Sequence, residues 1–501
     1  MTKDSDLLTV HDIVFSGGQD PDQHAIECPE YQPLTYRDLR LQILSVVKSL
    51  NARGFHRNDR IAIITPAGPE TAVIILSVMA GFTAVPLNPQ NREQEYRSNL
   101  IQLKIKAVIV QKGYETAARA AVTSLNIPLI ELVPGGGRAG NFELEPKVVP
   151  DAREAEFGTT ADIVTVLLTS GTTAAPKIVP LSHEQFCEDA HKMTAKYHYT
   201  HTDRHLHIVP YYHVTGFKGT LVTPLLSGGT IICTKDFIPS DFPFLLKTCH
   251  PTIYVSVPAM HQGILREVRK VSPGELKNNS LREIRSGSAS LPATVNQELE
   301  RLLGVSVTNG YAMSETGMIS ANIPPREGSV GIPMIDSLAI MDENGNALGP
   351  DETGEIVVKG KSVFSGYEDA PEENKLAFIN GWFRTGDMGY LDTDGYLFIT
   401  GRKKDLINKG GEKISPEEID NVIRSHPRVK EAMTFPVKDP VLGEDIAAMV
   451  VRADSKVTEN ELYMYLLDRL VPFKVPSRIY FVDTIPKTPT GKPLRHTGTK
   501  Q

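Results

Sequence analysis

Cysteine and long apolar runs are scarce in this chain of 501 residues, and both absences narrow its class. The four cysteines stand far apart without a Cys-x-x-Cys pair, which favours reduced thiols over disulfides or zinc ligands. No stretch approaches the roughly eighteen apolar residues of a membrane span, and the polar residues 1–6 do not resemble a signal peptide. We therefore predict a cytoplasmic protein without a membrane span.

The chain also has fewer basic than acidic residues. The 53 lysines and arginines are outnumbered by 60 aspartates and glutamates, which gives a formal net charge of −7. Because the chain contains no long basic run, neither nucleic acid nor an anionic membrane is an expected partner. The C-terminal residues 498–501 do not form a peroxisomal address of the Ser-Lys-Leu type.

The chain exceeds the size at which a single hydrophobic core keeps growing, so we expect at least two folding units. From about residue 35 to residue 330, apolar runs rich in β-formers alternate with helix-length segments, a pattern typical of parallel sheets covered by helices. The expected strands are 60–64, 107–110, 206–209, 230–233, 252–257 and 305–308, and the expected helices are 70–80 and 292–303.

From residue 329 to residue 400 the pattern changes to short strands separated by turns, which predicts a small β-barrel or sandwich that closes the first unit. A new pattern follows, with expected helices at 416–425 and 458–470 and expected strands at 429–437, 445–451 and 478–482. We predict an α/β protein with two domains. Residues 1–401 would form stacked, mostly parallel sheets with helices plus the small β-barrel, and residues 402–501 a small mobile α+β domain.

The segment 167–177 reads Leu-Leu-Thr-Ser-Gly-Thr-Thr-Ala-Ala-Pro-Lys and follows an apolar strand. Hydroxyls and backbone N–H groups can surround phosphate oxygens, and Lys177 adds a positive charge. It is not a Walker loop, because the Gly-x-x-x-x-Gly-Lys-Ser/Thr spacing is missing. The segment predicts a polyphosphate site at a strand end, where open α/β sheets bind ligands, and a solvent-exposed Ser/Thr-rich loop is the alternative.

A second polar cluster, Asn-Gly-Tyr-Ala-Met-Ser-Glu-Thr-Gly at 309–317, follows another expected strand. The Tyr311 ring can stack on a purine, and the Ser314 hydroxyl can bond a phosphate. The Glu315 carboxylate can hold Mg²⁺, which neutralises polyphosphate charge. The two clusters together indicate a nucleotide site.

Three more motifs complete the pattern: Gly-Trp-Phe-Arg-Thr-Gly-Asp at 381–387, Gly-Arg-Lys-Lys-Asp at 401–405 and Pro-Thr-Gly-Lys at 489–492. In this order, the set resembles the adenylate-forming superfamily, which includes acyl-CoA synthetases, peptide-synthetase adenylation domains and luciferases. The resemblance extends from about residue 30 to residue 495. It implies ATP, Mg²⁺ and coenzyme A as cofactors and a small-molecule carboxylic acid as substrate.

The resemblance implies roles for individual residues at the nucleotide. The expected phosphate contacts are Thr169, Ser170, Gly171, Thr172, Thr173 and Lys177. Tyr311 is expected to stack on adenine beside the loop Gly287, Ser288 and Ala289, and further expected nucleotide contacts are Asn309 and Gly310. Ser314 replaces the threonine more usual in this family and keeps the hydroxyl. The expected ribose contacts are Asp387 and Arg402, since carboxylates commonly accept ribose hydroxyls.

The implied chemistry has two steps. ATP activates a carboxylic acid to an acyl-adenylate with release of pyrophosphate, and the thiol of CoA then takes the acyl group. The expected catalytic residues are Glu315 as the Mg²⁺ ligand, His213 as an aromatic gate near the acid, and Lys492 as the bridge between acid and α-phosphate. Because both steps share one site, residues 402–501 are expected to reorient about Lys404 and present Gly410 and Gly411 to the pantetheine arm.

Within the superfamily the motifs look most like acid–CoA ligases of the oxalyl-CoA synthetase-like group. Relatives that act on oxalate have a histidine shortly after the motif glutamate, whereas this chain reads Thr-Gly-Met at 316–318, so oxalate is not the expected acid. Several small residues are among those expected at the acid pocket, which are His213, Thr215, Gly219, Ser256, Gly287, Gly310, Thr316 and Gly317.

Two alternatives to a CoA ligase stay open. In the first, the acceptor thiol belongs to a carrier protein in trans, since no carrier domain follows residue 501. Its aminoacyl version is disfavoured because the segment 210–217 has no early acidic residue to pair with an amine. The second is a nucleotide sensor without turnover, which the intact Glu315 and Lys492 disfavour.

Several other side chains have a plainer interpretation than a site. No acidic or thiol ligand completes a metal site with the nearby histidines His198, His201, His205 and His207, of which the last two share a strand face. A solvated surface is expected, rather than contact with CoA phosphates, for Lys403, Lys404, Lys409 and Lys413. Lys218, one turn beyond His213, is expected to extend along the surface rather than face the acid.

Overall fold

The computed structural model describes residues 7–148, 154–169, 176–276, 278–287, 291–454, 456–487 and 493–495. Its contacts divide the chain into two compact units. The first comprises Met1–Ala321, Met334–Asp336 and Lys359–Ala377, and the second Asn322–Pro333, Ser337–Val358 and Phe378–Gln501. The domain boundary predicted after residue 401 lies inside the second unit and stays a prediction.

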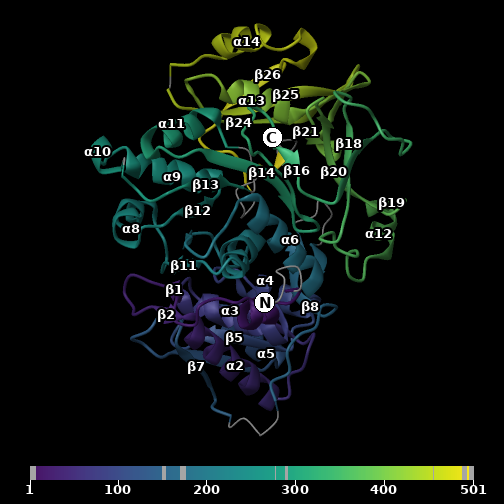
Figure 1. Ribbon diagram of the computed structural model, residues 1–501. Helices are drawn as coiled ribbons and strands as arrows, with labels where there is room; N and C mark the ends of the chain where they lie inside the picture. The colour runs from purple at the N-terminus through teal and green to yellow at the C-terminus, as the bar shows by residue number, and fades with distance from the viewer. Residues whose placement is uncertain are drawn as a thin grey trace. The chain divides into compact units, whose positions relative to one another are not determined.

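The first unit contains a seven-stranded sheet, drawn in purple and blue in Figure 1. Its strands are β3 (Arg60–Ile64), β4 (Thr83–Pro86), β5 (Ala107–Gln111), β6 (Leu129–Pro134), β7 (Phe142–Glu145), β8 (Ile163–Thr169) and β9 (Lys177–Ser182). The order is β7-β6-β5-β3-β4-β8-β9, and neighbours are parallel except at the edges, where β7 and β9 are antiparallel. Side chains of β3, β5 and β8 form one core with the helices α4 (Glu93–Gln102) and α5 (Ala118–Leu125).

A second sheet of the first unit contains β1 (His24–Glu27), β2 (Leu34–Thr35), β10 (Arg204–His207), β11 (Thr230–Cys233), β12 (Ile253–Ser256), β13 (Glu283–Ser286), β14 (Val307–Met313) and β15 (Gly317–Ala321). These strands follow the order β15-β14-β13-β12-β10-β11-β1-β2. All neighbours from β14 to β1 are parallel, so their carboxyl ends share one edge. In α/β proteins this edge is where ligands bind.

The remaining helices of the first unit are α1 (Val10–Ser16), α2 (Tyr36–Ala52), α3 (Pro69–Gly81), α6 (His183–Lys196), α7 (Thr223–Leu226), α8 (Phe242–Cys249), α9 (Pro258–Val268), α10 (Pro273–Leu276), α11 (Ala293–Leu303) and α12 (Pro371–Ala377). Every residue of α3 is buried, because α3 contacts β3, β4 and β8 as well as α1, α2 and the π-helix η2 (Thr215–Val222). Apolar residues on all sides are expected of such an interior helix. Over the described ranges, none of the helices combines the length and apolar character needed to cross a membrane.

The second unit contains two five-stranded sheets, drawn in green and yellow in Figure 1. One consists of β17 (Ser337–Met341), β18 (Gly354–Lys359), β19 (Phe378–Ile379), β20 (Trp382–Leu391) and β21 (Leu397–Arg402). The other consists of β22 (Ile407–Lys409), β23 (Glu412–Ile414), β24 (Val429–Asp439), β25 (Gly443–Arg452) and β26 (Arg478–Phe481). Buried side chains of this second sheet form a core with α13 (Pro416–Arg424) and α14 (Glu459–Leu467). The short strand β16 (Ile332–Pro333) also belongs to this unit.

The predicted α/β fold class is confirmed, and the strands expected at 60–64 and 230–233 coincide with β3 and β11. One boundary differs in a way that matters for the site. The strand expected at 305–308 begins at Val307 and continues to Met313, because its second half pairs with β15. Asn309, Gly310 and Tyr311 are therefore held in a sheet rather than in a loop.

Candidate active site

The predicted phosphate loop begins at the carboxyl end of a parallel strand, as expected. β8 ends at Thr169, whose register partner on β9 is Lys177, the first residue of that strand. This pairing holds the two ends of the loop at adjacent positions of one sheet. Four further residues predicted to contact phosphate lie outside the described part of the chain: Ser170, Gly171, Thr172 and Thr173.

Lys177 is connected to Glu315 through Tyr367, a residue that the sequence motifs did not single out. The Lys177 ammonium lies 4.6 Å from the centre of the Tyr367 ring, and the Tyr367 hydroxyl donates a 2.9 Å hydrogen bond to Glu315 Oε1. Burial, and then the Glu315 carboxylate, raise the pKa of Tyr367, so the phenol keeps its proton and remains a donor. The tyrosine therefore brings the predicted phosphate-binding lysine and the predicted metal ligand together.

Glu315 lies beside Ser314 in the turn between β14 and β15. It is 6% exposed, and its backbone carbonyl accepts a 2.7 Å hydrogen bond from the Phe364 N–H. A mostly buried carboxylate that is held at both side chain and backbone is a preorganised oxygen ligand, the type that Mg²⁺ prefers. The chemistry of Glu315 therefore fits the metal role expected from the sequence.

The residues predicted to surround adenine come from the carboxyl ends of two neighbouring parallel strands. Ser286, the last residue of β13, is in register with Asn309 on β14. The N–H of Gly287 donates a 3.0 Å hydrogen bond to the carbonyl of Ser256, at the end of β12. The predicted segments thus meet at one edge of the second sheet.

Gly310 and Tyr311 continue along β14 at this edge. A Cβ atom at Gly310 would lie 2.6 Å from the Ser320 carbonyl oxygen on β15, so only glycine fits there without displacing the backbone. Tyr311 is 8% exposed. The other two residues of the adenine prediction, Ser288 and Ala289, lie outside the described residues.

His213 lies just before the π-helix η2, which also carries Thr215 and Gly219 of the predicted acid pocket. Its ring centre is 4.6 Å from that of Tyr212. Burial lowers the pKa of His213, so the imidazole is neutral at physiological pH. π-Helices are rare and are frequently found at functional sites. The geometry therefore suits a neutral aromatic gate beside an anionic acid.

The expectation that Lys218 extends along the surface is wrong. Lys218 is 4% exposed, and its ammonium lies 3.0 Å from Asp189 Oδ2 on α6 and 4.9 Å from the centre of the Phe186 ring. The reason is that the carboxylate of α6 supplies the opposite charge that a buried ammonium requires. The lysine is therefore part of the interior of the first unit.

In the second unit, the two residues predicted to hold the ribose are cross-strand neighbours. β20 and β21 place Asp387 opposite Arg402, and Arg402 Nε lies 2.9 Å from Asp387 Oδ1. Asp387 is 4% exposed. The arginine therefore holds the carboxylate in one orientation.

The lysines near the predicted hinge are mostly paired with carboxylates. Three of them form ion pairs, Lys403 with Glu355, Lys409 with Asp445 and Lys413 with Glu343. Lys404 is exposed in the short 3₁₀ helix η4 (Lys403–Asp405). The pairs reduce the positive charge that this surface offers to CoA phosphates.

Gly410 and Gly411 form the two-residue turn of the β22–β23 hairpin. Their φ angles are +61° and +98°, the left-handed region that hairpin turns of this length require and glycine adopts readily. Both residues are exposed. An exposed turn without side chains suits the close approach of a pantetheine arm. Lys492, the predicted catalytic lysine, lies outside the described residues.

Of the four histidines considered as metal ligands, the two buried ones, His205 and His207, pack against aromatic rings. His205 lies edge-on to Tyr199 at 4.8 Å, and His207 stacks on Tyr211 at 3.9 Å. Burial lowers the pKa of both His205 and His207 to about 3. Across the described ranges, no group of three or more His, Cys, Asp or Glu side chains could hold a metal ion.

Two residues with contacts near the site were not predicted from the sequence: Tyr367, which contacts Lys177 and Glu315, and Asp189, which pairs with Lys218. Tyr367 lies 52 residues from Glu315 and belongs to none of the motifs, so no local signal reveals their contact. Asp189 lies between Phe186 and Met193 on the buried face of α6. A lone acidic residue on an apolar helix face is a signal that helical periodicity could have provided.

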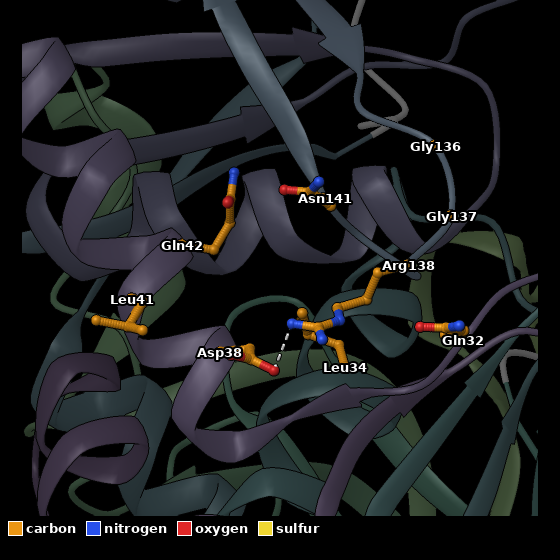
Figure 2. Close-up of a pocket in the computed structure, with 9 residues that line it drawn as sticks. All are labelled: Gln32, Leu34, Asp38, Leu41, Gln42, Gly136, Gly137, Arg138 and Asn141. Atoms are coloured by element: carbon orange, nitrogen blue, oxygen red, sulfur yellow. Dashed lines mark hydrogen bonds and ion pairs between the residues drawn. The ribbon is translucent and has the colours of Figure 1, made fainter.

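A separate pocket of about 450 Å³ lies elsewhere in the first unit (Figure 2). It is lined by residues before and within α2 and by the loop that contains Gly136 and Gly137. Its arginine, Arg138, pairs with Asp38 at 2.7 Å, as the dashed line in Figure 2 shows. None of the residues predicted from the motifs lines this pocket, so it does not compete with the nucleotide assignment.

Known protein families match most of the chain. The model for AMP-binding enzymes matches residues 16–368, and the model for the AMP-binding enzyme C-terminal domain matches residues 418–492. These ranges include three of the five motifs, at 167–177, 309–317 and 489–492, whereas the motifs at 381–387 and 401–405 lie between the two ranges.

Individual relatives are similar over nearly the whole chain. The probable CoA ligase CCL9 of Humulus lupulus is 38% identical over 476 residues, which cover 92% of this chain and 90% of the relative. An oxalate–CoA ligase of Arabidopsis thaliana is 35% identical, with 94% of each chain covered. The crystal structure of ATP-bound MatB from Rhodopseudomonas palustris has a TM-score of 0.87 at 28% identity, with 98% of each chain covered.

Proposed function

The chain belongs to the AMP-binding enzyme family, and on that premise we propose how its own residues carry out the family's reaction. The enzyme is an AMP-forming acid–thiol ligase. It uses ATP to convert a carboxylic acid into an acyl-adenylate, with release of pyrophosphate, and transfers the acyl group to CoA. The observation that carries the residue assignment is the connection from Lys177 through Tyr367 to Glu315.

We assign the ATP phosphates to the loop 169–177 and the metal ion to Glu315. Mg²⁺ held there would offset the negative charge of the triphosphate. Lys177 adds a cation at the end of the loop, and Tyr367 orients the Glu315 carboxylate by donating to Oε1. The arrangement supplies the opposite charges that a polyphosphate needs before an anionic acid can approach.

We assign adenine to the edge formed by Gly287 and Tyr311 and the ribose hydroxyls to Asp387 and Arg402. β13 ends at Ser286, opposite Asn309 of β14, so Gly287 and the continuing residues Gly310 and Tyr311 of β14 follow the same edge of the sheet. The ion pair between Asp387 and Arg402 keeps the carboxylate oriented, as recognition of two vicinal hydroxyls requires.

We assign the acid to the segment around His213 and the adenylation step to Lys492. A neutral imidazole does not repel or trap the incoming carboxylate, and burial keeps His213 neutral. The Lys492 ammonium would offset charge on the acid and on the α-phosphate as the new bond forms. Residues 402–501 would then turn about Lys404 and bring Gly410 and Gly411 to the pantetheine arm.

The proposed substrate is a carboxylic acid other than oxalate. No histidine follows Glu315 in the segment 316–318. At Gly317 there is also no room for a side chain, because a Cβ atom would lie 2.3 Å from Asp189 Cγ. The pocket around this segment therefore differs from that expected for oxalate.

Acid-dependent pyrophosphate release tests the reaction directly. We expect release with some members of a panel of aliphatic, dicarboxylic, aromatic and amino acids, and acyl-CoA formation when CoA is added. Competition between CoA and a carrier protein bearing phosphopantetheine identifies the acceptor, and preference for the carrier would contradict the CoA assignment. Absence of pyrophosphate release with every acid would contradict the adenylation itself.

A lysine substitution tests the assignment of Lys492. We expect Lys492→Ala to slow adenylation by roughly 10²–10³, the scale of losing one transition-state electrostatic contact. Thioester formation from supplied acyl-adenylate should survive. Lys487→Ala is the matched control, because Lys487 lies in the same segment but pairs with Glu431 at 2.6 Å. Equal losses in both half-reactions of the Lys492 variant would contradict the assignment.

We also propose that the enzyme works in the cytoplasm. The cysteines Cys28, Cys187, Cys233 and Cys249 are all free and buried. Free thiols persist in a reducing compartment, whereas oxidising compartments favour disulfides. Fractionation of the native host's cells with an antibody against the chain tests this location, and enrichment in a membrane or secreted fraction would contradict it.

A further inference from the structure

A buried ion pair joins helix α6 to the π-helix η2 and to the turn that carries Glu315. The side chain of Asp189 on α6 is 2% exposed, and its Oδ2 lies 3.0 Å from the ammonium of Lys218, whose side chain is 5% exposed. The other carboxylate oxygen, Oδ1, accepts a 2.8 Å hydrogen bond from the N–H of Met318. One carboxylate thus contacts both η2 and the beginning of β15.

The turn is shaped to receive this carboxylate. Gly317 has a φ angle of +72°, in the left-handed region that favours glycine. A Cβ atom at this position would lie 2.3 Å from Asp189 Cγ and 2.4 Å from its Oδ2. The absence of a side chain therefore lets Asp189 rest directly on the backbone, two residues after Glu315.

The other side of the ion pair is held by the π-helix. Thr220 Oγ1 donates a 2.7 Å hydrogen bond to the Gly216 carbonyl, and Thr223 Oγ1 donates at 2.9 Å to the Lys218 carbonyl. His207 Nδ1 lies 2.6 Å from Thr220 Oγ1 and ties η2 to β10. These contacts satisfy backbone groups of η2, so Lys218 extends from a well-supported segment.

Stability alone does not explain this arrangement. The desolvation of two charges offsets most of their attraction, and apolar residues of similar volume can replace a buried pair without loss. An apolar pair would, however, leave the buried N–H of Met318 without an acceptor, and an unsatisfied buried donor is costly. The feature that requires a carboxylate is therefore the hydrogen bond to the turn.

We propose that Asp189 is a positioning residue that fixes the turn 314–317, and that Lys218 neutralises its charge. The turn carries Glu315, so the position of the metal ligand depends on a helix and a π-helix that do not touch the metal. This inference rests on the proposed role of Glu315. It adds a link between the π-helix of the predicted acid pocket and the residue that holds Mg²⁺.

Two double variants test the link. Asp189→Asn/Lys218→Met removes both buried charges and keeps an oxygen that can accept from the Met318 N–H. Asp189→Leu/Lys218→Met has nearly the same shape and charge but no acceptor. Both are made in the full-length chain. Mg²⁺ binding is measured by calorimetry in the presence of α,β-methylene-ATP, and hydrogen exchange is followed in the peptide that contains residues 314–318.

We expect the leucine variant to bind Mg²⁺ roughly 10- to 100-fold more weakly than the asparagine variant, the usual effect of losing a group that orients a metal ligand. Exchange at residues 314–318 should also be faster in the leucine variant. If that variant does not fold, Asp189→Ala/Lys218→Met takes its place with the same expected results. Equal Mg²⁺ affinity and equal exchange in the two double variants would overturn the proposal.

Two other results separate this proposal from the function on which it rests. Changed preference among acids, with unchanged Mg²⁺ binding in both double variants, would overturn the positioning role and place the pair at the acid. Glu315→Gln tests the metal role independently. If Glu315→Gln binds Mg²⁺ as the native chain does, the assignment of Glu315 fails. If it weakens binding while the double variants agree, only the positioning role of Asp189 fails.

Discussion

Two short hairpin turns show how differently the two units use similar local geometry. The turn between β14 and β15 carries Glu315 in the interior of the first unit, and Asp189 from α6 contacts its backbone. The turn between β22 and β23 consists of Gly410 and Gly411, which are exposed. Both turns contain glycine at positive φ. A Cβ atom at Gly317 would lie 2.3 Å from Asp189 Cγ, whereas a Cβ atom at Gly410 would lie 3.2 Å from Leu442 Cδ2. A fixed turn suits a metal ligand, whereas an exposed turn suits a substrate arm that enters and leaves.

The ion pairs near the two turns also differ in their exposure to solvent. The pair of Lys218 and Asp189 in the first unit has side chains 5% and 2% exposed, whereas the pair of Lys413 and Glu343 in the second has side chains 60% and 70% exposed. Water and salt screen the exposed pair much more strongly than the buried one. The loss of the lysine should therefore cost far more stability in the buried pair than in the exposed pair.

The largest predicted effect is that of losing one partner of the buried pair. We expect Lys218→Met to lower the free energy of unfolding by about 3–5 kcal/mol, because it leaves the Asp189 charge buried and unpaired. Denaturant titration measures the change. Lys413→Met on β23, beside the exposed turn, is the matched control, and its unfolding midpoint should not move. Similar shifts in the two variants would contradict the contrast between the turns.

The next largest effect concerns the glycines. We expect Gly317→Ala to cost about 3 kcal/mol, because it combines overpacking against Asp189 with a left-handed residue. Gly411→Ala should cost about 1–2 kcal/mol, since it adds only the left-handed conformation. Thermal unfolding of both variants provides the comparison. A loss at Gly411 as large as that at Gly317 would show that neighbouring side chains are not what restricts the first turn.

A smaller effect concerns the buried histidines of the first unit. Burial lowers the pKa of His205 to about 3 from 6.5. Above about pH 6.5 neither the folded nor the unfolded state binds this proton, whereas between the two values only the unfolded state does. Stability should therefore fall as the pH falls, by about 1.4 kcal/mol per pH unit from this histidine.

Replacement of the imidazole tests the pH effect. His205→Leu should flatten the dependence of the unfolding free energy on pH between about pH 6 and pH 4, measured by denaturant titration at several values. Among the residues that the structure describes, neither nitrogen of the His205 ring has a hydrogen-bond partner, so an apolar residue should be tolerated there. An unchanged slope in this variant would mean that other groups cause the dependence.

The smallest predicted effect is at Tyr367. Tyr367→Phe removes the hydrogen bond to Glu315 and keeps the ring under Lys177, so we expect a loss of about 1 kcal/mol in stability and weaker Mg²⁺ binding with nucleotide. Tyr390→Phe is the control in the second unit, where the Tyr390 ring stacks on Phe398. If both variants bind Mg²⁺ as the native chain does, Tyr367 does not orient the metal ligand.

Much of the fold was predictable because its signals are local. Alternation of apolar strands and helices identified β3, β11 and α3. Each of these elements contains a continuous run of buried residues, so its own sequence is enough to predict it. The family was predictable because five of its motifs occur in the expected order along the chain. The extension of β14 to Met313 was not predictable, since it depends on pairing with β15 rather than on the strand's own residues.

The residues that surround the site were harder to predict from the sequence, because their contacts also depend on distant parts of the chain. The placement of Lys218 was predicted wrongly, because a lysine taken alone favours water and its partner lies on another helix. Tyr367 was not identified at all, although it contacts two residues that were. Contacts between residues far apart in the chain leave no periodic pattern from which to infer them.

The sequence by itself determined the family, the α/β class and the identity of the groups expected to meet ATP, because each depends on residues that are close together in the chain. Only the tertiary structure decided which side chains hold those groups in place. Asp189 accepts a hydrogen bond from the Met318 N–H because α6 brings it there, and Lys218 can be buried because that carboxylate is present. Burial strengthens electrostatic contacts and penalises unpaired charges, so the value of each group depends on neighbours that only folding supplies.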